Sequence, residues 1–161
     1  MPRVASWFGI SVLVVLLDFA TKWIVLGKLA PGESRFLAPF FNLVLVFNKG
    51  AAFSFLASAP GWQTPLLAAI AIAASAVIAY LILKNLNKRL FCFGLALILG
   101  GAIGNLIDRL RFGQVVDFLD FHALGWHWPA FNVADSAITV GAVILILESF
   151  VHREKQPSAP A

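Results

Sequence analysis

Charged residues are scarce in this sequence of 161 residues. Asp, Glu, Lys and Arg together make up 12% of it, while hydrophobic residues make up 60%. In a typical soluble domain roughly 25% of the residues are charged. A chain as apolar as this one could not bury all of its hydrophobic side chains away from water. The composition therefore excludes an ordinary soluble domain and indicates a protein of the lipid bilayer.

Cysteine is almost absent, and the basic residues form no cluster. The single cysteine, Cys92, excludes an internal disulfide, and because it lies in an apolar run we expect it to be packed in the interior. The net charge of +4 comes from scattered Lys and Arg residues with no stacking aromatic residues among them. We therefore expect no nucleic-acid partner.

Long apolar runs, by contrast, are abundant. A helix needs roughly 20 apolar residues to cross a bilayer, and four runs approach this length, at about residues 4–26, 66–83, 90–107 and 133–151. The sequence therefore predicts an all-α bundle of four transmembrane helices in one membrane-embedded domain over residues 1–155. Residues 156–161 are expected to form a disordered cytoplasmic tail.

The first run begins after Arg3 and superficially resembles a cleavable signal peptide. Unlike a signal peptide, it continues past Asp18 and Lys22 and reaches spanning length. We therefore expect this segment to remain in the protein as the first transmembrane helix.

Four spans place both ends of the chain on the same side of the membrane. Basic residues are dense at these ends and in the short connection between the second and third spans, where the sequence has Arg3, Lys84, Lys88, Arg89, Arg153 and Lys155. The longer connections on the other side hold basic residues at lower density. Because cytoplasmic segments carry the excess of Lys and Arg, both termini are predicted to be cytoplasmic.

The two longer connections, at about residues 27–65 and 108–132, are then extracytoplasmic. A loop of nearly 40 residues is uncommon unless it has structure of its own. Residues 36–47 and 115–121 have strand-like composition, and a turn signal (NKG) follows the first of them at residues 48–50. The sequence therefore predicts a small extracytoplasmic β-sheet on the membrane surface.

Two charged residues, Asp18 and Lys22, interrupt the first span. A charged side chain within a span costs at least about 2.5 kcal/mol, so each needs a reason to be there. They lie four residues apart on one helix face, in the order that favours an ion pair. The pair either locks the first helix to its neighbours or belongs directly to an active site, and in both cases this face is expected to point into the bundle.

The third run ends in small and polar residues. Gly100 and Gly104 form a pattern of small residues that permits close contact between helices. Asn105, Asp108 and Arg109 follow at spacings of three and four, so their side chains can form a network at the outer mouth of the bundle. The alternative is that Asp108 and Arg109 only mark the end of the helix.

Asp117 and Asp135 are the central candidates for chemistry. One follows the third span and the other begins the fourth, so both can return to the same outer rim. Two neighbouring carboxyl groups share a proton, and such a pair can activate a water and polarise a peptide carbonyl without a metal. The alternatives are an N-cap role for Asp135 and an exposed strand position for Asp117. Asp120 is a competing carboxylate, whereas Glu148 lies too far along its span.

Other chemistries have weaker support. His122 and His127 lie on a loop without a clear third ligand for zinc. Ser136 could pair with Lys22 or Lys49 as nucleophile and base, but the spacing does not single this pairing out. Charged residues within spans would also suit a transporter or proton relay, and a structural or assembly factor is a third class. We expect neither a metal nor a cofactor.

Five blocks of the sequence occur together in the order found in one family. They are DxxTK at 18–22, NKGAAFS at 48–54, GGAIGNLIDR at 100–109, VVDF at 115–118 and FNVADS at 131–136. On these blocks nearly the whole chain resembles the lipoprotein signal peptidases, the bacterial signal peptidase II family of aspartyl proteases. The sequence does not depart from the family pattern at the key positions.

The resemblance implies an endopeptidase that removes signal peptides from prolipoproteins once a diacylglyceryl group is attached to a cysteine, cutting just before that cysteine. It implies that Asp117 and Asp135 are the catalytic pair. It further implies supporting or substrate-binding roles for Asp18, Lys22, Asn48, Gly50, Asn105, Arg109, Asn132 and Ala134. We add Asp108 to this set, because it belongs to the expected network at the helix end.

The resemblance also implies a location and a set of partners. The protein is expected in the bacterial cytoplasmic (inner) membrane, with the active site toward the periplasmic face. Its expected partners are lipid-modified prolipoprotein signal peptides, membrane lipids and inhibitors of the globomycin type. We expect it to act as a monomer.

Overall fold

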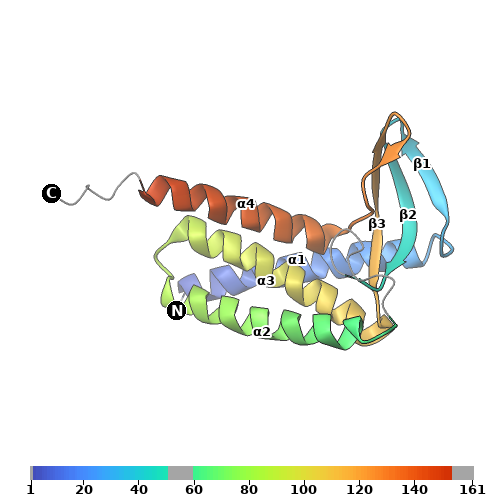
Figure 1. Cartoon of the computed structure of the whole chain (residues 1–161). Helices are drawn as coiled ribbons and strands as arrows, with labels where there is room; N and C mark the ends of the chain where they lie inside the picture. Colours follow the sequence, from blue (N-terminus) through green and yellow to red (C-terminus); the bar gives the residue numbers. More distant parts are fainter. Residues whose placement is uncertain (1, 51–59, 154–161) are drawn as a thin grey trace.

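The computed structural model describes residues 2–50 and 60–153. The end of the NKGAAFS block and the expected tail at 156–161 lie outside the described residues. Four helices run side by side, and a β-sheet stands at one end of them, as Figure 1 shows. The beginning of α1 and the end of α4 lie at the opposite end of the bundle. The predicted fold class, four helices with a small sheet, is confirmed.

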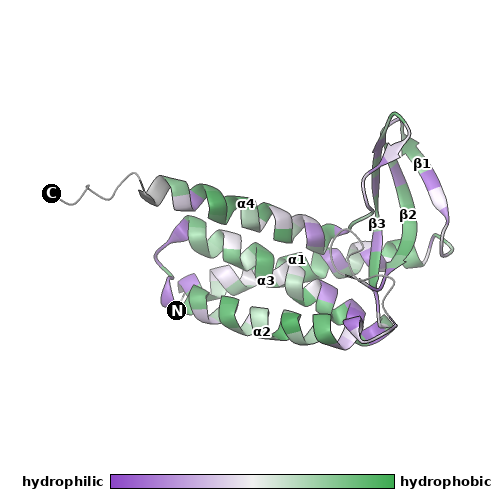
Figure 2. Cartoon of the chain, viewed as in Figure 1, coloured by the Kyte–Doolittle hydropathy of each residue, from purple (hydrophilic) through white to green (hydrophobic). Residues whose placement is uncertain are grey.

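The four helices are long and apolar enough to cross a membrane. They are α1 (Pro2–Leu26), α2 (Gln63–Lys84), α3 (Arg89–Phe112) and α4 (Val133–Arg153). Hydrophobic residues colour most of their length in Figure 2, and outward side chains such as Leu13 and Ile72 are more than half exposed. Apolar residues on all sides of a helix fit a lipid surrounding.

Helix α3 packs against each of the other three helices, and glycines make this possible. A Cβ atom at Gly100 would lie 2.7 Å from the Ser11 carbonyl oxygen of α1, and one at Gly101 would collide with the Ala134 carbonyl oxygen of α4. The helix runs past its predicted end at residue 107 and stops at Gly113, whose φ of 69° suits a helix C-terminus. Asp108 therefore lies inside the helix.

The sheet is antiparallel with strand order β1-β2-β3-β4. Its strands are β1 (Ser34–Ala38), β2 (Phe41–Asn48), β3 (Val115–Ala123) and β4 (Trp126–His127). The prediction of one strand-like segment over 36–47 was wrong, because a turn at Pro39 and Phe40 divides it into a hairpin. Proline has no N–H for a strand ladder, and its fixed φ favours a turn.

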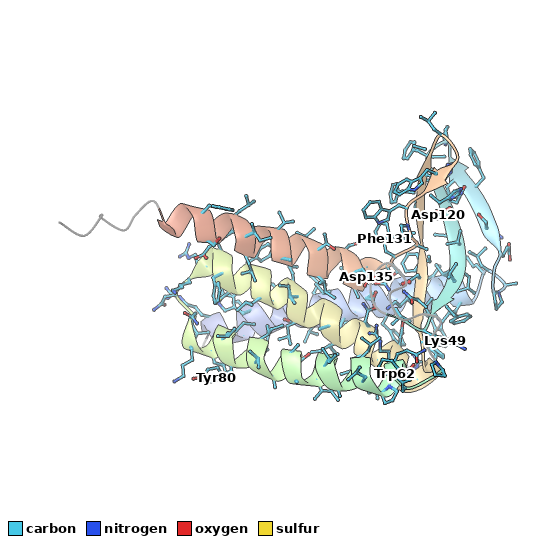
Figure 3. All side chains as sticks on the ribbon, in the orientation of Figure 1. Lys49, Trp62, Tyr80, Asp120, Phe131 and Asp135 are labelled. Atoms are coloured by element: carbon cyan, nitrogen blue, oxygen red, sulfur yellow. The ribbon has the colours of Figure 1, made fainter. Side chains whose placement is uncertain are left out.

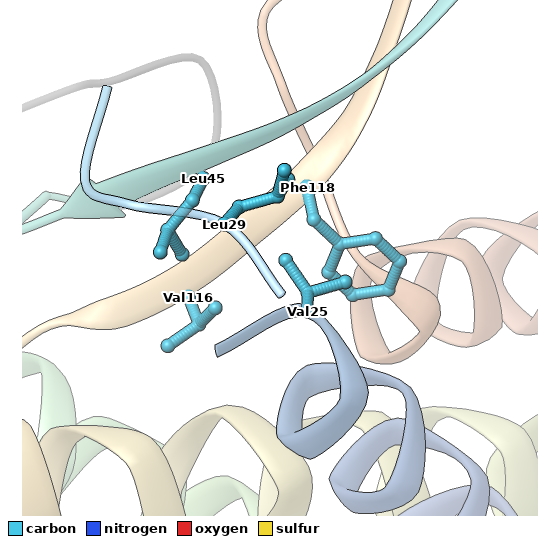
Figure 4. Packing of buried hydrophobic residues seen from close by; sticks show 5 residues of the cluster. All are labelled: Val25, Leu29, Leu45, Val116 and Phe118. Atoms are coloured by element: carbon cyan, nitrogen blue, oxygen red, sulfur yellow. The ribbon is translucent and has the colours of Figure 1, made fainter. Parts of the chain in front are cut away.

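A hydrophobic cluster joins the sheet to the bundle (Figure 4). It contains Val25 and Leu29 from the end of α1, Leu45 from β2, and Val116 and Phe118 from β3. Successive side chains of a strand point to opposite faces. The residue between Val116 and Phe118 therefore points away from this cluster, and that residue is Asp117.

A second cluster lies between α2 and α3 and includes Ile82, Cys92 and Leu95. Cys92 is fully buried there, which confirms the predicted packing role.

Candidate active site

A cavity of about 330 Å³ lies where α3, α4 and the sheet meet. Asp117 from β3 and Asp135 from α4 both line it, with Asn48, Asn105 and Arg109 around them. Figure 3 shows Asp135 at the beginning of α4, beside the sheet. The structure thus brings the two predicted acids, and three of the predicted supporting residues, to one cavity.

Asp135 is placed by the way in which α4 begins. The Asn132 side-chain oxygen accepts a hydrogen bond from the Asp135 backbone N–H at 2.9 Å, and Asp135 Oδ2 accepts one from the Asn132 backbone N–H at 3.3 Å. This reciprocal arrangement is a capping box. The N-cap is therefore Asn132, so the alternative that Asp135 is only an N-cap is wrong, and Asp135 Oδ1 still points to other partners.

Asn132 connects the two acids directly. Its side chain is fully buried, and its Nδ2 donates to Asp117 Oδ1 at 2.7 Å. The same Nδ2 lies 3.2 Å from Asn105 Oδ1 and 3.2 Å from the Val116 carbonyl oxygen. One residue therefore binds the carboxyl groups of both Asp117 and Asp135.

Asp117 lies in a buried, crowded position. It is only 2% exposed, which excludes the alternative of an exposed strand position, and its Oδ2 accepts a hydrogen bond from Asn48 Nδ2 at 3.1 Å. Burial, and next the negative charge of Asp135, raise the pKa of Asp117 to about 7, although the hydrogen bonds from Asn48 and Asn132 oppose this shift. Asp117 can therefore keep its proton near neutral pH.

Asp135 is held by a different amide. Asn105 Nδ2 donates to Asp135 Oδ1 at 2.7 Å. On the same cavity wall, the Arg109 guanidinium donates to the Gly50 carbonyl oxygen at 3.1 Å. The Gly50 N–H in turn donates to Asn48 Oδ1 at 2.8 Å, which closes a turn of the kind that asparagine favours. The predicted turn at 48–50 is thereby confirmed.

Lys22 occupies the centre of a buried ionic cluster beneath the acids. Its Nζ lies 2.7 Å from Asp18 Oδ2 and 2.8 Å from Asp108 Oδ2. It also donates to Asn105 Oδ1 at 3.2 Å. Asn105 Nδ2 faces Asp135, so Asn105 connects Lys22 to this acid by hydrogen bonds.

The two acids of this cluster also hold backbone groups. Asp18 Oδ1 accepts the Ala134 N–H of α4 at 2.9 Å, and Asp108 Oδ2 accepts the Val116 N–H of β3 at 3.0 Å. The cluster therefore ties α1 and α3 to the segments that carry Asp117 and Asp135. Asp108 does more than mark the end of a helix.

Asp120, the competing carboxylate, lies away from the cavity, further out along the sheet (Figure 3). It accepts a hydrogen bond from Asn42 Nδ2 at 2.9 Å and lies 2.8 Å from His127 Nδ1. Burial opposes its ionisation, but these two hydrogen bonds, together with the charge interactions with His127 and His122, outweigh burial and lower the pKa of Asp120. His122 stacks on His127, and the described residues contain no group of three His, Cys, Asp or Glu that could hold a metal.

Ser136 and Glu148, two other candidates, take no part in the arrangement of the acids. The Ser136 hydroxyl donates to the Asn132 carbonyl oxygen at 2.9 Å, and the Lys22 ammonium is occupied by carboxylates, so these two do not form a nucleophile and base pair. Glu148 lies 13 residues beyond Asp135 on α4, about 20 Å along the helix.

Several residues that line the cavity were not predicted from the sequence, among them two aromatic residues and two residues of α4. Trp128 and Phe131 come from the segment before α4, and Thr139 and Val140 come from the next turn of α4. Helical spacing places Thr139, four residues after Asp135, on the same face, so this residue could have been found. The aromatic pair could not, because its position depends on how the sheet packs.

Known proteins of one family resemble this chain over most of its length. The family described as signal peptidase (SPase) II matches residues 10–151. The lipoprotein signal peptidase of Paraburkholderia phymatum is 56% identical over 144 residues, which are 89% of this chain and 87% of that protein. The lipoprotein signal peptidase of Burkholderia mallei is 58% identical, and the match covers the same fractions of both chains.

A solved structure is similar over nearly the whole chain. It is described as a bacterial membrane enzyme, has a TM-score of 0.84 and 30% identity, and the match covers 98% of this chain and 95% of that one. The sequence match and the shared fold lead to one conclusion: this chain is a multi-pass membrane protease and belongs to the signal peptidase II family.

Proposed function

We propose that this protein is a lipoprotein signal peptidase that works by an aspartic mechanism and cuts just before the lipidated cysteine. The named relatives support the substrate class. The observation that carries the mechanism is the placement of two carboxyl groups in one cavity, both bound by the buried Asn132. Residues 1–155 would act as one peptidase domain, with the β-rich segment at about 27–65 as part of it.

In the proposed reaction the two acids start in different protonation states. Asp117 holds the shared proton, consistent with its raised pKa, and Asp135 is ionised. Asp135 takes a proton from a water as the water oxygen bonds to the carbonyl carbon of the scissile peptide. At the same time Asp117 gives its proton to the carbonyl oxygen, which produces a tetrahedral diol.

The diol then collapses. Asp135 gives its proton to the amide nitrogen, the C–N bond breaks, and one diol hydroxyl returns a proton to Asp117. The signal peptide leaves with a carboxyl end, and the lipidated cysteine is left with a free amino group. Asn48, Asn105 and Asn132 hold the carboxyl groups in place without adding charge, since amides are neutral donors.

The cavity is suited to a substrate that arrives through the lipid. Val140 lines it and is 51% exposed on the surface of α4. A signal peptide helix could therefore approach along α4 and bring its end to Asp135. We propose that this occurs in the bacterial inner membrane, with both termini cytoplasmic and the cavity on the periplasmic side, and that the protein acts as a monomer among membrane lipids. An inhibitor of the globomycin type would compete for the same cavity.

The test is cleavage of a lipidated prolipoprotein by the purified protein in proteoliposomes. Asp117→Asn and Asp135→Asn should each lower the rate at least a hundredfold, since a general acid or base contributes about 10²–10⁴. Asp120→Asn is the matched control, because Asp120 lies outside the cavity, and it should retain activity. Mass spectrometry should find the new amino end on the lipidated cysteine.

Three results would contradict the proposal. One is full activity in either cavity variant, which would exclude the acid pair. Another is a product cut elsewhere in the peptide. The third is ion flux without peptide products, which would favour a transporter.

A further inference from the structure

A second cavity, of about 380 Å³, lies beside the first at the outer end of the sheet. We call it the aromatic cavity. It shares two residues, Trp128 and Phe131, with the cavity of the acids. Its other walls include Phe40, Phe121, Ala123 and Trp126.

The strand β3 connects the two cavities. Asp117, Phe121 and Ala123 are separated by even numbers of residues, so their side chains emerge on the same face of the strand. Phe121 lies four residues from Asp117, which corresponds to about 13 Å along a strand. A substrate group that starts at Asp117 and follows this face therefore enters the aromatic cavity.

The cavity of the acids continues in two directions. Toward the bundle it is bounded by Thr139 and Val140 of α4, and toward the sheet by Trp128 and Phe131. If the scissile bond of a substrate lies between these two ends of the cavity, the signal helix extends toward one end and the lipidated cysteine toward the other. In the proposed function the signal helix extends into the lipid along α4, so the cysteine and its lipid are left on the side of the aromatic cavity.

The walls of the aromatic cavity suit hydrocarbon. His122 is part of the lining, but no Asp, Glu, Lys or Arg lines the part of the cavity that the structure describes, and Trp126 and Phe40 are 61% and 58% exposed. A peptide segment there would leave backbone N–H and C=O groups without partners, which is unfavourable, whereas an acyl chain has no such groups. The β3–β4 end of the sheet also reaches sideways past α4 (Figure 1), so a chain could enter from the bilayer.

We propose that the aromatic cavity binds one acyl chain of the diacylglyceryl group on the substrate cysteine. This inference rests on the proposed function and adds a lipid subsite to it. The cavity would favour cysteines that carry long acyl chains and would act on substrate binding rather than on the chemical step.

The experiment compares two synthetic prolipoprotein peptides with the same signal segment, one with palmitoyl and one with butyryl chains on the glycerol. Wild-type protein should prefer the long chains at least about tenfold in kcat/KM, because each buried methylene contributes several-fold. Ala123→Trp fills the cavity and should remove most of this preference through KM. The second cavity variant is Trp126→Ala, which opens the cavity. The control is Leu37→Trp, which adds a tryptophan, as Ala123→Trp does, but on the exposed strand β1.

Several outcomes would overturn the inference. They are equal wild-type rates on both peptides, an unchanged preference in both cavity variants, and an equal loss on both peptides. An unchanged preference, together with quenching of tryptophan fluorescence by brominated bilayer lipid that is lost in Trp126→Ala, would assign the cavity to bilayer lipid instead. If wild-type protein cut neither lipidated peptide, the proposed function itself would fail, and the inference would fall with it.

Discussion

At the scale of single residues, the surroundings of Asp117 oppose the loss of its proton. Its pKa is raised from 3.8 to about 7 in the folded protein, so between these pH values the unfolded chain releases a proton that the folded protein keeps. Stability must then fall as pH rises through this window, by up to about 4 kcal/mol. We predict that Asp117→Asn flattens the decline of the melting temperature between pH 5 and pH 8.

Asp120 provides the control for this measurement. Its pKa is lowered, so its contribution to stability is present at neutral pH and is lost only as the pH falls through its folded value. Asp120→Asn should therefore keep the decline that Asp117→Asn removes. The explanation would be wrong if both variants had the same pH dependence as the wild type.

Lys22 is the residue whose removal should cost most stability. In Lys22→Met the carboxylates of Asp18 and Asp108 stay buried without their cation, and breaking a buried ion pair in this way costs about 3–5 kcal/mol. Lys28→Met makes the same chemical change at an exposed position and should have little effect. Thermal unfolding in detergent measures both, and equal melting temperatures would contradict the central role of the cluster.

Asp18 and Lys22 could be found from the sequence, because a charge within a membrane span is costly and needs a reason. The role of Asn132 could not be found in this way. Its bonds reach Asp117, Asn105 and Asp135, three residues that only the tertiary fold brings together. From local sequence, Asn132 and Asp135 indicate no more than the start of a helix.

At the scale of elements, the contact between α3 and α4 depends on Gly101. A Cβ atom there would collide with the Ala134 carbonyl oxygen, and backbone cannot move aside as a flexible side chain can. We predict that Gly101→Ala destabilises the protein by about 1–3 kcal/mol, as overpacking does. The shift of α4 would also displace Asp135, so activity should fall.

Gly9→Ala is the matched control, because a Cβ at Gly9 of α1 would have no atom within 4 Å. Replacing glycine by alanine in a helix is otherwise favourable by up to about 1 kcal/mol. The control should therefore be neutral or more stable in thermal unfolding. A loss of stability in Gly9→Ala as large as that in Gly101→Ala would refute the explanation.

The elements differed in how well the sequence predicted them. The helices were found because bilayer thickness sets their length, whereas the hairpin was missed because composition alone does not fix where a strand turns. Pro39 was the available signal. The pairing of β2 with β3, which sets Val46 opposite Asp117, joins residues far apart in sequence and was beyond local patterns.

At the scale of the whole molecule, the sheet and the α2–α3 connection lie at opposite ends of the bundle, and the proposed orientation places the sheet on the periplasmic side. Leu124 at the tip of the β3–β4 hairpin and Lys88 between α2 and α3 are both exposed and lie at opposite ends of the bundle. Leu124→Cys should react with an impermeant thiol reagent added to intact spheroplasts, and Lys88→Cys only after permeabilisation. The buried Cys92 should stay unlabelled, and the reverse pattern would invert the proposed orientation.

The central claim is that Asp117 and Asp135 act as one unit that holds one proton, and infrared titration of the Asp117 carboxyl group tests it most directly. A shared proton should give a protonated carboxyl band that disappears with a midpoint near pH 7 and is missing in Asp117→Asn. In Asp135→Asn the midpoint should move to lower pH, because the neighbouring negative charge has been removed. A midpoint that stays the same in Asp135→Asn, or no protonated band near neutral pH in the wild type, would show that the two acids do not share a proton.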